Sequence, residues 1–127
     1  MEYYNKVIES VQVRFLKGSN YKIEKPITVL NYQENENTLL LLHHGSLKFG
    51  EDQELVNEGE VIFLPKDRKT NLTFGNKTTK QEITGEQFAE TRRKHLQSIS
   101  YKEIKSTDED CVSLFQFESK VFDVVNF

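Results

Sequence analysis

The sequence predicts a mainly β fold, a small β-barrel or sandwich with one inserted or flanking α-helix. Short apolar runs separated by turn residues recur roughly every 8 to 12 residues, as in such folds. Residues 39 to 65 are the clearest case, because they read as an apolar strand, a glycine turn, a short strand, a polar turn and a final strand ended by proline. Helical spacing of apolar residues is seen only at about 85 to 99.

The first strands are expected before residue 33. Apolar residues at odd-numbered positions between 7 and 15 predict a strand within roughly 9 to 16. Gly18-Ser19-Asn20 would end this strand. Two more short strands are expected at 21 to 24 and 27 to 32, separated by Pro26. The polar run that follows, from Gln33 to Asn37, predicts a loop.

The meander over 39 to 65 comes next. Leu39 to Leu42 is a fully apolar run of strand length, and Gly45 ends it. Gly59 fits a position where the chain must turn sharply before the last strand. Pro65 ends that strand because proline has no N–H to donate to a neighbouring strand. After a charged turn, a further strand is expected at 72 to 74.

One helix is predicted, from about 85 to 99. The run from Thr84 to Gln87 has the form of a capping box. An isolated helix of this length is marginal in water, so its apolar side must cover either the barrel wall or a second subunit. The polar residues 101 to 110 predict a loop or edge strand, and alternation resumes at 112 to 117. The candidate interaction side of the helix carries four residues at helical spacing: Phe88, Arg92, Leu96 and Ile99.

Length and charge exclude several classes of protein. The 127 residues, 1 to 127, are enough for a single domain with one core. Seventeen Lys and Arg against 20 Asp and Glu give a net charge of −3, which argues against a nucleic-acid surface spread over the domain. One cysteine excludes an internal disulfide, and no segment resembles a signal peptide or membrane span, so we expect a cytoplasmic protein without a membrane partner.

Few residues suggest catalysis or metal binding. His43 and His44 are neighbours on a predicted strand and would point to opposite faces, so they do not readily hold one metal ion. Cys111 follows three acidic residues, which raise a thiol pKa and favour a half-exposed structural cysteine over a nucleophile. We therefore expect no enzyme, no metal and no cofactor. The basic run Arg92-Arg93-Lys94 is read as a solvated face, with a partner contact or an anion-binding surface as the alternative.

A family resemblance rests on the glycine-turn meander, on the segment Glu58 to Pro65 (EGEVIFLP) and on Phe115 to Asp123 (FQFESKVFD). Together these resemble the N-terminal regulatory domain of AraC-type transcription regulators, a branch of the cupin superfamily, over roughly residues 25 to 127. The resemblance implies a cupin-like double-stranded β-helix, or jelly-roll, barrel that binds a small effector or a partner protein and mediates dimerisation. DNA would be bound only by helix-turn-helix units outside these residues.

Metal-binding cupins resemble one another in histidines that this chain lacks. They carry a His-x-His pair and a Glu before the glycine that corresponds to Gly45, where residues 31 to 36 here contain no histidine. They carry a further His after the proline, where Lys69 and Thr70 stand here. This difference favours the regulator branch. The rival hypotheses are a stand-alone cupin with a non-standard metal site, using His43 or His44 with Glu58 or Glu60, and a protein-interaction module.

The effector is expected inside the barrel, since small barrels either fill their interior or hold one small ligand. Residues 121 to 127 are strongly apolar and are expected to lead into a linker toward a DNA-binding domain, the chain then being the N-terminal part of a longer regulator. The candidate barrel-lining residues are Tyr21, Val29, Leu40, Leu42, His44, Phe63, Phe74 and Phe117.

Overall fold

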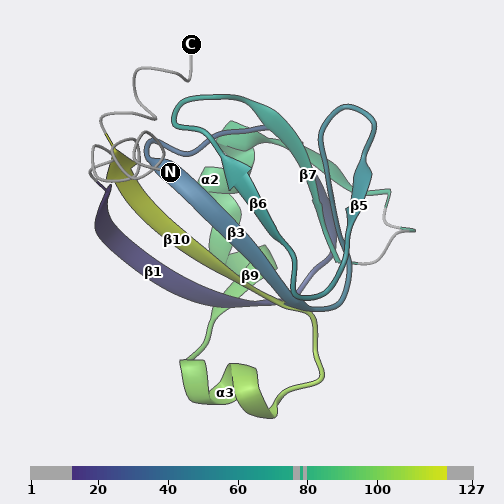
Figure 1. Cartoon of the computed structure of the whole chain (residues 1–127). Helices are drawn as coiled ribbons and strands as arrows, with labels where there is room; N and C mark the ends of the chain where they lie inside the picture. The colour runs from purple at the N-terminus through teal and green to yellow at the C-terminus, as the bar shows by residue number, and fades with distance from the viewer. Residues whose placement is uncertain (1–12, 76–77, 79, 120–127) are drawn as a thin grey trace.

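The computed structural model describes residues 13–75, 78 and 80–119, so the expectation for residues 121 to 127 lies outside the described part. The described chain forms two five-stranded sheets and two helices, α2 (Gly85–His95) and α3 (Tyr101–Ser106) (Figure 1). Sheet A contains, in spatial order, β6 (Val61–Leu64), β3 (Asn37–His44), β10 (Cys111–Ser119), β1 (Val13–Ile23) and β9 (Leu96–Ser98). Sheet B contains β5 (Glu54–Val56), β4 (Leu47–Phe49), β7 (Thr70–Phe74), β2 (Ile27–Tyr32) and β8 (Glu82–Thr84).

The mainly β prediction is confirmed, but the expected closed barrel is not. Within the described residues each sheet has its own set of hydrogen-bonded strands, and no strand pairs across from sheet A to sheet B. Neighbouring strands are antiparallel except for β2 and β8, which run parallel. The strand β10, late in the sequence, lies between β3 and β1, so sheet A depends on contacts between distant parts of the chain.

A continuous apolar core fills the space between the sheets. In β3, Leu40 and Leu42 are fully buried, while the alternate residues Leu39 and Leu41 lie on the outer face and are half-buried. Sheet B supplies the opposite side of the core, chiefly through Leu72 and Phe74 of β7, which are also fully buried. The two-residue period of the strands therefore sets which leucines enter the core.

The strand β1 differs from its prediction, because it continues through Gly18-Ser19-Asn20 and includes residues 21 to 23 of the separate strand expected at 21 to 24. The expected start of this strand, at residues 9 to 12, lies outside the described part. A Cβ atom on Gly18 would lie 3.3 Å from Cζ of Phe15 and 3.6 Å from Cδ1 of Phe115. Glycine thus allows close packing of the Phe15 ring here and does not make a turn.

The meander is found as predicted, with one added strand. Gly45 (φ +100°) and Gly59 (φ +86°) adopt the left-handed conformation that glycine tolerates, and Pro65 follows the last residue of β6. The expected polar turn ends in the short strand β5, which pairs with β4. The two glycine turns fix where β3 ends and where β6 begins.

The helix α2 begins as predicted and ends earlier. Thr84 and Gln87 form both hydrogen bonds of a capping box. The helix stops at His95 instead of 99, because Leu96 is extended (φ −123°, ψ 118°) and residues 96–98 pair with β1 as β9. The helix therefore connects β8, at one edge of sheet B, directly to β9, at one edge of sheet A.

A second helix, α3, occupies part of the segment expected as a loop or edge strand. Ser100 and Glu103 form a second capping box, which supplies partners for backbone N–H groups at the start of the helix. Ile104 is its one buried residue. The helix projects beyond the sheets at the lower end in Figure 1. None of the helices in the described ranges has the length and apolar character needed to cross a membrane.

Candidate functional site

Four of the eight candidate lining residues belong to the packed core. Val29, Leu40, Leu42 and Phe74 have no exposed surface and contact the same core cluster. Phe74 stacks on Phe88 of α2, with ring centroids 5.7 Å apart. These side chains fill the space between the sheets with one another, so an effector in contact with them would have to displace core residues.

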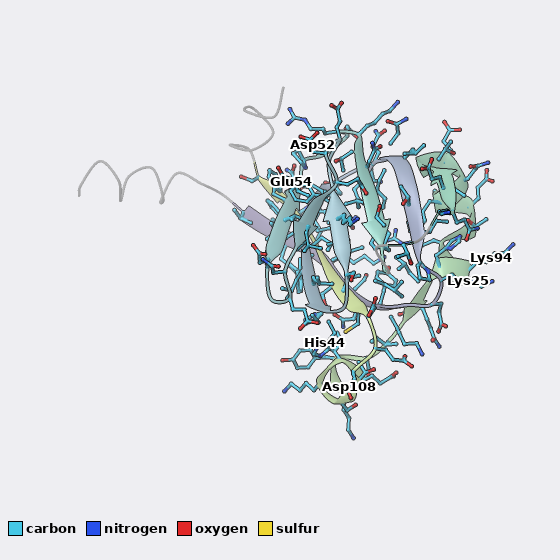
Figure 2. The ribbon with its side chains drawn as sticks, turned by 90° about the vertical axis from the view of Figure 1, so that its right-hand side faces the viewer. Lys25, His44, Asp52, Glu54, Lys94 and Asp108 are labelled. Atoms are coloured by element: carbon cyan, nitrogen blue, oxygen red, sulfur yellow. The ribbon has the colours of Figure 1, made fainter. Side chains whose placement is uncertain are left out.

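Phe63 and Phe117 lie on the other side of sheet A and do not face the space between the sheets. Their rings stack at 6.0 Å on the outer face, where Phe63 is 36% exposed. The reason is strand parity, since Ile62 and Leu64 take the inward positions of β6. His44 lies half-buried at the end of β3, near α3 in the view of Figure 2. Tyr21, by contrast, borders a hollow.

That hollow is a groove of about 900 Å³ between the inner side of β1 and the helix α2. We call it the β1–α2 groove. The strand contributes alternate residues, which all point toward the helix, and the helix contributes two neighbouring arginines. Its polar and aromatic lining includes Lys17, Ser19 and Tyr21 of β1, Arg92 and Arg93 of α2, and Ser98 of β9.

Arg92 is the central side chain of the groove. Its guanidinium carbon lies 5.0 Å from the centroid of the Tyr21 ring and 5.8 Å from that of Phe88, within range of cation–π attraction. Its Nη1 lies 3.6 Å from a carboxylate oxygen of Glu34. Its Nε is buried and has no hydrogen-bond acceptor. The helix prediction included Arg92 on the side expected to cover either the barrel wall or a second subunit, and the structure places it beside a groove.

Glu34 anchors Arg92 to the rest of the fold. The Tyr32 hydroxyl donates a hydrogen bond to one carboxylate oxygen of Glu34, and Gln116 Nε2 donates to the other at 3.1 Å. Burial raises the pKa of the Tyr32 hydroxyl well above its usual range, and the charge of Glu34 adds to this effect. Tyr32 therefore remains a protonated donor at neutral pH. Glu34 is only 10% exposed, so its partners hold it in one place.

A serine and a histidine are in contact on the outer face of sheet A. His43 Nε2 lies 2.6 Å from Ser113 Oγ, and Ser113 donates its own hydroxyl proton to Asn20 Oδ1 at 2.6 Å. Because that proton is already given to Asn20, His43 Nε2 must be the donor to Ser113, and it cannot act as the base that activates this serine. Ser113 is also only 1% exposed. The arrangement is a structural hydrogen-bond chain across β3, β10 and β1.

Cys111 is fully buried, which corrects the expectation of a half-exposed thiol. Cys111 is the first residue of β10 and pairs with His44, the last residue of β3, so it lies at one end of sheet A. Burial raises the pKa of the Cys111 thiol, and Asp110 and Glu58 raise it further. The direction agrees with the sequence prediction, but burial is the larger cause. A thiol of this kind is unsuited to nucleophilic catalysis.

The alternative metal site does not assemble in the described part of the chain. Across residues 13–75, 78 and 80–119, no three His, Cys, Asp or Glu side chains lie close enough together to hold a metal ion. The two acidic candidates have other partners: Glu58 accepts from the Gly45 N–H at 3.0 Å, and Glu60 from the Asn57 N–H at 2.8 Å. Both carboxylates stabilise turns of the meander.

Comparison with known proteins gives no relative. Neither the protein-family models, nor the curated proteins, nor the solved structures yield a match to this chain. The site therefore stands on its own geometry. Sequence reasoning missed Lys17, Ser19 and Ser98 as groove residues, because it ended the first strand at Gly18 and extended the helix over Ser98. Residues 17 to 20 (KGSN) contain no large apolar residue, so periodicity gave no sign that the strand continues through them.

Proposed function

We propose that this chain is a non-catalytic sensory domain, the ligand-sensing and dimerisation part of a bacterial AraC-type transcription regulator, and that its effector binds in the β1–α2 groove. The observation that carries the proposal is the contrast between a filled core and an open groove. Val29, Leu40, Leu42 and Phe74 are fully buried, whereas Ser19, Tyr21 and Arg92 border about 900 Å³ of open space. Ligand sites of small molecules have volumes of roughly 300 to 1,000 Å³.

The cupin-like part of the proposal is supported by the two facing sheets and by the meander. Two five-stranded sheets enclose one core, and Gly45 and Gly59 turn the chain at the positions that carry the resemblance. In this proposal α2 closes the edge between the sheets where β8 and β9 lie. The effector would therefore bind at an edge of the sandwich and not at its centre.

The absence of catalysis is proposed on chemical grounds. In the described part of the chain, the Ser113 hydroxyl contacts His43 and Cys111 pairs with His44 across two strands, and both nucleophiles are buried. The proton arrangement leaves Ser113 without a base, and burial raises the pKa of Cys111. Neither group borders the β1–α2 groove.

Dimerisation is proposed to use the outer face of sheet A, with a second copy of this chain as the partner. Four large apolar side chains on that face, Val13, Phe15, Val61 and Phe63, are between 36% and 63% exposed. Apolar groups gathered on one sheet face are typical of an interaction surface.

A protein-interaction module is the second candidate, and the filled core favours it over a stand-alone cupin. In that case the same groove would take a side chain or a short segment of a partner polypeptide. The complete gene separates the regulator proposal from a stand-alone cupin. A stand-alone cupin would be expected to hold its ligand without any attached DNA-binding domain.

The first experiment is translation of the gene beyond Phe127. A downstream pair of helix-turn-helix units is the expected result, and a downstream catalytic domain would overturn the regulator proposal. The second is a thermal-shift screen of small molecules on the chain, since a ligand that binds the native state raises its melting temperature. Ser19→Trp should fill the groove and remove the shift, whereas Ser106→Trp, on the exposed surface of α3, should keep it.

A further inference from the structure

The β1–α2 groove is basic although the chain is acidic. The whole sequence has a net charge of −3, yet the residues that line the groove include four cations, Lys17, Arg92, Arg93 and Lys94. Two carboxylates oppose them, Glu90 in the lining and Glu34, which pairs with Arg92. Positive charges that converge on a concave surface raise the local concentration of anions. A local excess of positive charge, in a protein with a negative net charge, indicates a negatively charged ligand.

Arg92 has donors that the protein does not use. A guanidinium group carries five N–H donors. Arg92 Nε is buried without an acceptor, and the 3.6 Å distance from Nη1 to Glu34 is an ion pair longer than a normal hydrogen bond. The side chain as a whole is 30% exposed, so a ligand would meet the accessible part of the guanidinium and not Nε. The neighbouring Tyr21 ring, 5.0 Å away, and Glu34 together restrict the orientation of the group. The guanidinium is therefore held in position while its hydrogen-bonding capacity is unfilled, which suits a carboxylate.

The groove also offers an apolar surface beside these charges. The ring of Tyr21 and the methyl group of Ala89 both border it, and the hydroxyl groups of Ser19 and Ser98 lie on the strand side. A bare inorganic anion would leave this surface in water. A molecule with a charged end and an apolar body would cover it and gain from its burial.

We propose that the β1–α2 groove binds a small organic carboxylate, with the carboxylate on Arg92 and the apolar body along Tyr21 and Ala89. The inference deepens the proposed sensory function and rests on it for the biological meaning of the ligand. The binding event itself depends only on the groove. Arg92 contacts Glu34, which is hydrogen-bonded to Tyr32 of β2 and to Gln116 of β10. A ligand on Arg92 would therefore be linked by side-chain contacts to both sheets.

The test uses 3-phenylpropionate as the probe, its neutral amide as the matched control compound, and inorganic phosphate. Calorimetric titration of the full chain should show binding of the carboxylate that weakens as salt is added. The amide should bind roughly tenfold more weakly or worse, because a charge-assisted hydrogen bond is about twice as strong as a neutral one. Phosphate should bind more weakly than the carboxylate, since it has no apolar body.

Two variants locate the site. Arg92→Gln should reduce the affinity for the carboxylate at least about tenfold, and Arg92→Lys should restore part of it through charge alone. Since loss of Arg92 also leaves Glu34 without its cation, Ser19→Asp serves as a second variant that keeps this pair and places a negative charge in the groove. Arg68→Gln, in the exposed turn after β6, removes the same charge elsewhere and should bind like the parent protein. Amide NMR spectra establish that each variant is folded.

Equal affinity for the carboxylate and the amide would overturn the proposal, as would full carboxylate binding by folded Ser19→Asp. Stronger binding of phosphate than of 3-phenylpropionate would also overturn it, because the apolar body would then play no part. Absence of binding by the probe would remove the carboxylate class and leave the sensory function to be decided by the gene downstream of Phe127. The two failures are therefore distinguishable.

Discussion

The guanidinium of Arg92 lies over the ring of Tyr21, 5.0 Å from its centroid. This contact joins α2 to β1 across the groove, and each residue holds the other at the position where a ligand would touch both. Cation–π pairs contribute about 0.5 to 2 kcal/mol, depending on how far they are desolvated. The groove is therefore lined by side chains that are ordered before any ligand arrives, which lowers the entropy lost on binding.

The core contact of α2 gives the first prediction. Phe88 is 2% exposed, and its ring stacks on Phe74 and lies near Tyr32. Phe88→Ala should lower the free energy of unfolding by about 3 to 5 kcal/mol through lost burial and the cavity that remains. Phe63→Ala, at a ring that is 36% exposed, should lower it by less than half as much. Urea unfolding measures both, and similar losses would contradict the assignment of α2 to the core.

Gly85 provides a test in which two effects oppose each other. Alanine is favoured over glycine in a helix by up to about 1 kcal/mol. A Cβ atom at Gly85, however, would lie 2.3 Å from the backbone oxygen of Asn31 and 3.1 Å from its carbonyl carbon. We expect the clash to win, so Gly85→Ala should destabilise the chain by about 1 to 3 kcal/mol. Glu86→Ala in the same helical turn is the control, and stabilisation by Gly85→Ala would contradict the packing of α2 against β2.

The stability of the chain should fall between pH 7.5 and 5.5. Burial lowers the pKa of His95, and the charges of Lys25 and Lys94 add to this, although a backbone hydrogen bond with Lys25 partly opposes it. Figure 2 shows both lysines at the same side of the molecule. Burial also lowers the pKa of His43. The unfolded chain then binds more protons than the folded one below about pH 6.5, so stability is complete above that pH and is lost as the pH falls through it.

Urea unfolding as a function of pH measures this loss. A His43→Gln, His95→Gln double variant should show a smaller change between pH 7.5 and 5.5, while carboxylates, which titrate near pH 4, contribute little in that range. A double variant with the slope of the parent protein would show that other groups control this part of the pH profile.

Cys111 should be protected from thiol reagents. Because it is fully buried and its pKa is raised by that burial, an aromatic disulfide reagent at pH 8 should modify the folded chain on the order of 100-fold more slowly than the chain in urea. A Cys111→Ser, Ser106→Cys variant moves the thiol to an exposed position of α3 and should react rapidly when folded. Fast reaction of native Cys111 would mean that the end of sheet A opens readily.

Self-association of the chain should depend on the outer face of sheet A. Analytical ultracentrifugation should find a dimer at micromolar concentration, and Phe15→Ser combined with Val61→Ser should shift it to monomer. Tyr101→Ser, at an exposed aromatic residue on α3, is the control and should leave the apparent mass unchanged. A parent chain that is monomeric at high concentration would remove dimerisation from the proposed function.

The sequence predicted best what depends on near neighbours. The capping box at Thr84, the glycine turns at Gly45 and Gly59 and the strand end at Pro65 all rest on interactions within a few residues, and all are confirmed. Ser100 and Glu103 formed an equally local signal, but the polar character of 101 to 110 hid the helix that they cap. The sequence thus contained a local capping signal for α3, although the prediction for this segment was a loop or edge strand.

Predictions that depended on distant partners were less successful. Gly18 reads as a strand break, yet β1 continues through it, and the ring of Phe15 packs closely against it. Leu96 fits the helical spacing after Phe88 and Arg92, but the edge of β1 offers it a strand partner, Ile23. Phe63 follows an inward residue in an all-apolar strand, so composition could not tell which parity faces the core. For the same reason the groove was not predictable, since it exists only where β1 and α2 meet.

The helix α2 has no linker at either end, because Thr84 is both the last residue of β8 and the N-cap, and Leu96 is both the C-cap and the first residue of β9. Eleven residues at a regular helical rise of about 1.5 Å each would span roughly 16 Å, and Thr91 (φ −115°, ψ 17°) departs from helical geometry within this span. One residue added or removed within the helix would rotate everything after it by about 100° about the helix axis. The number of residues in this helix therefore determines the register in which β9 pairs with β1. It also determines the direction of Arg92 relative to Tyr21.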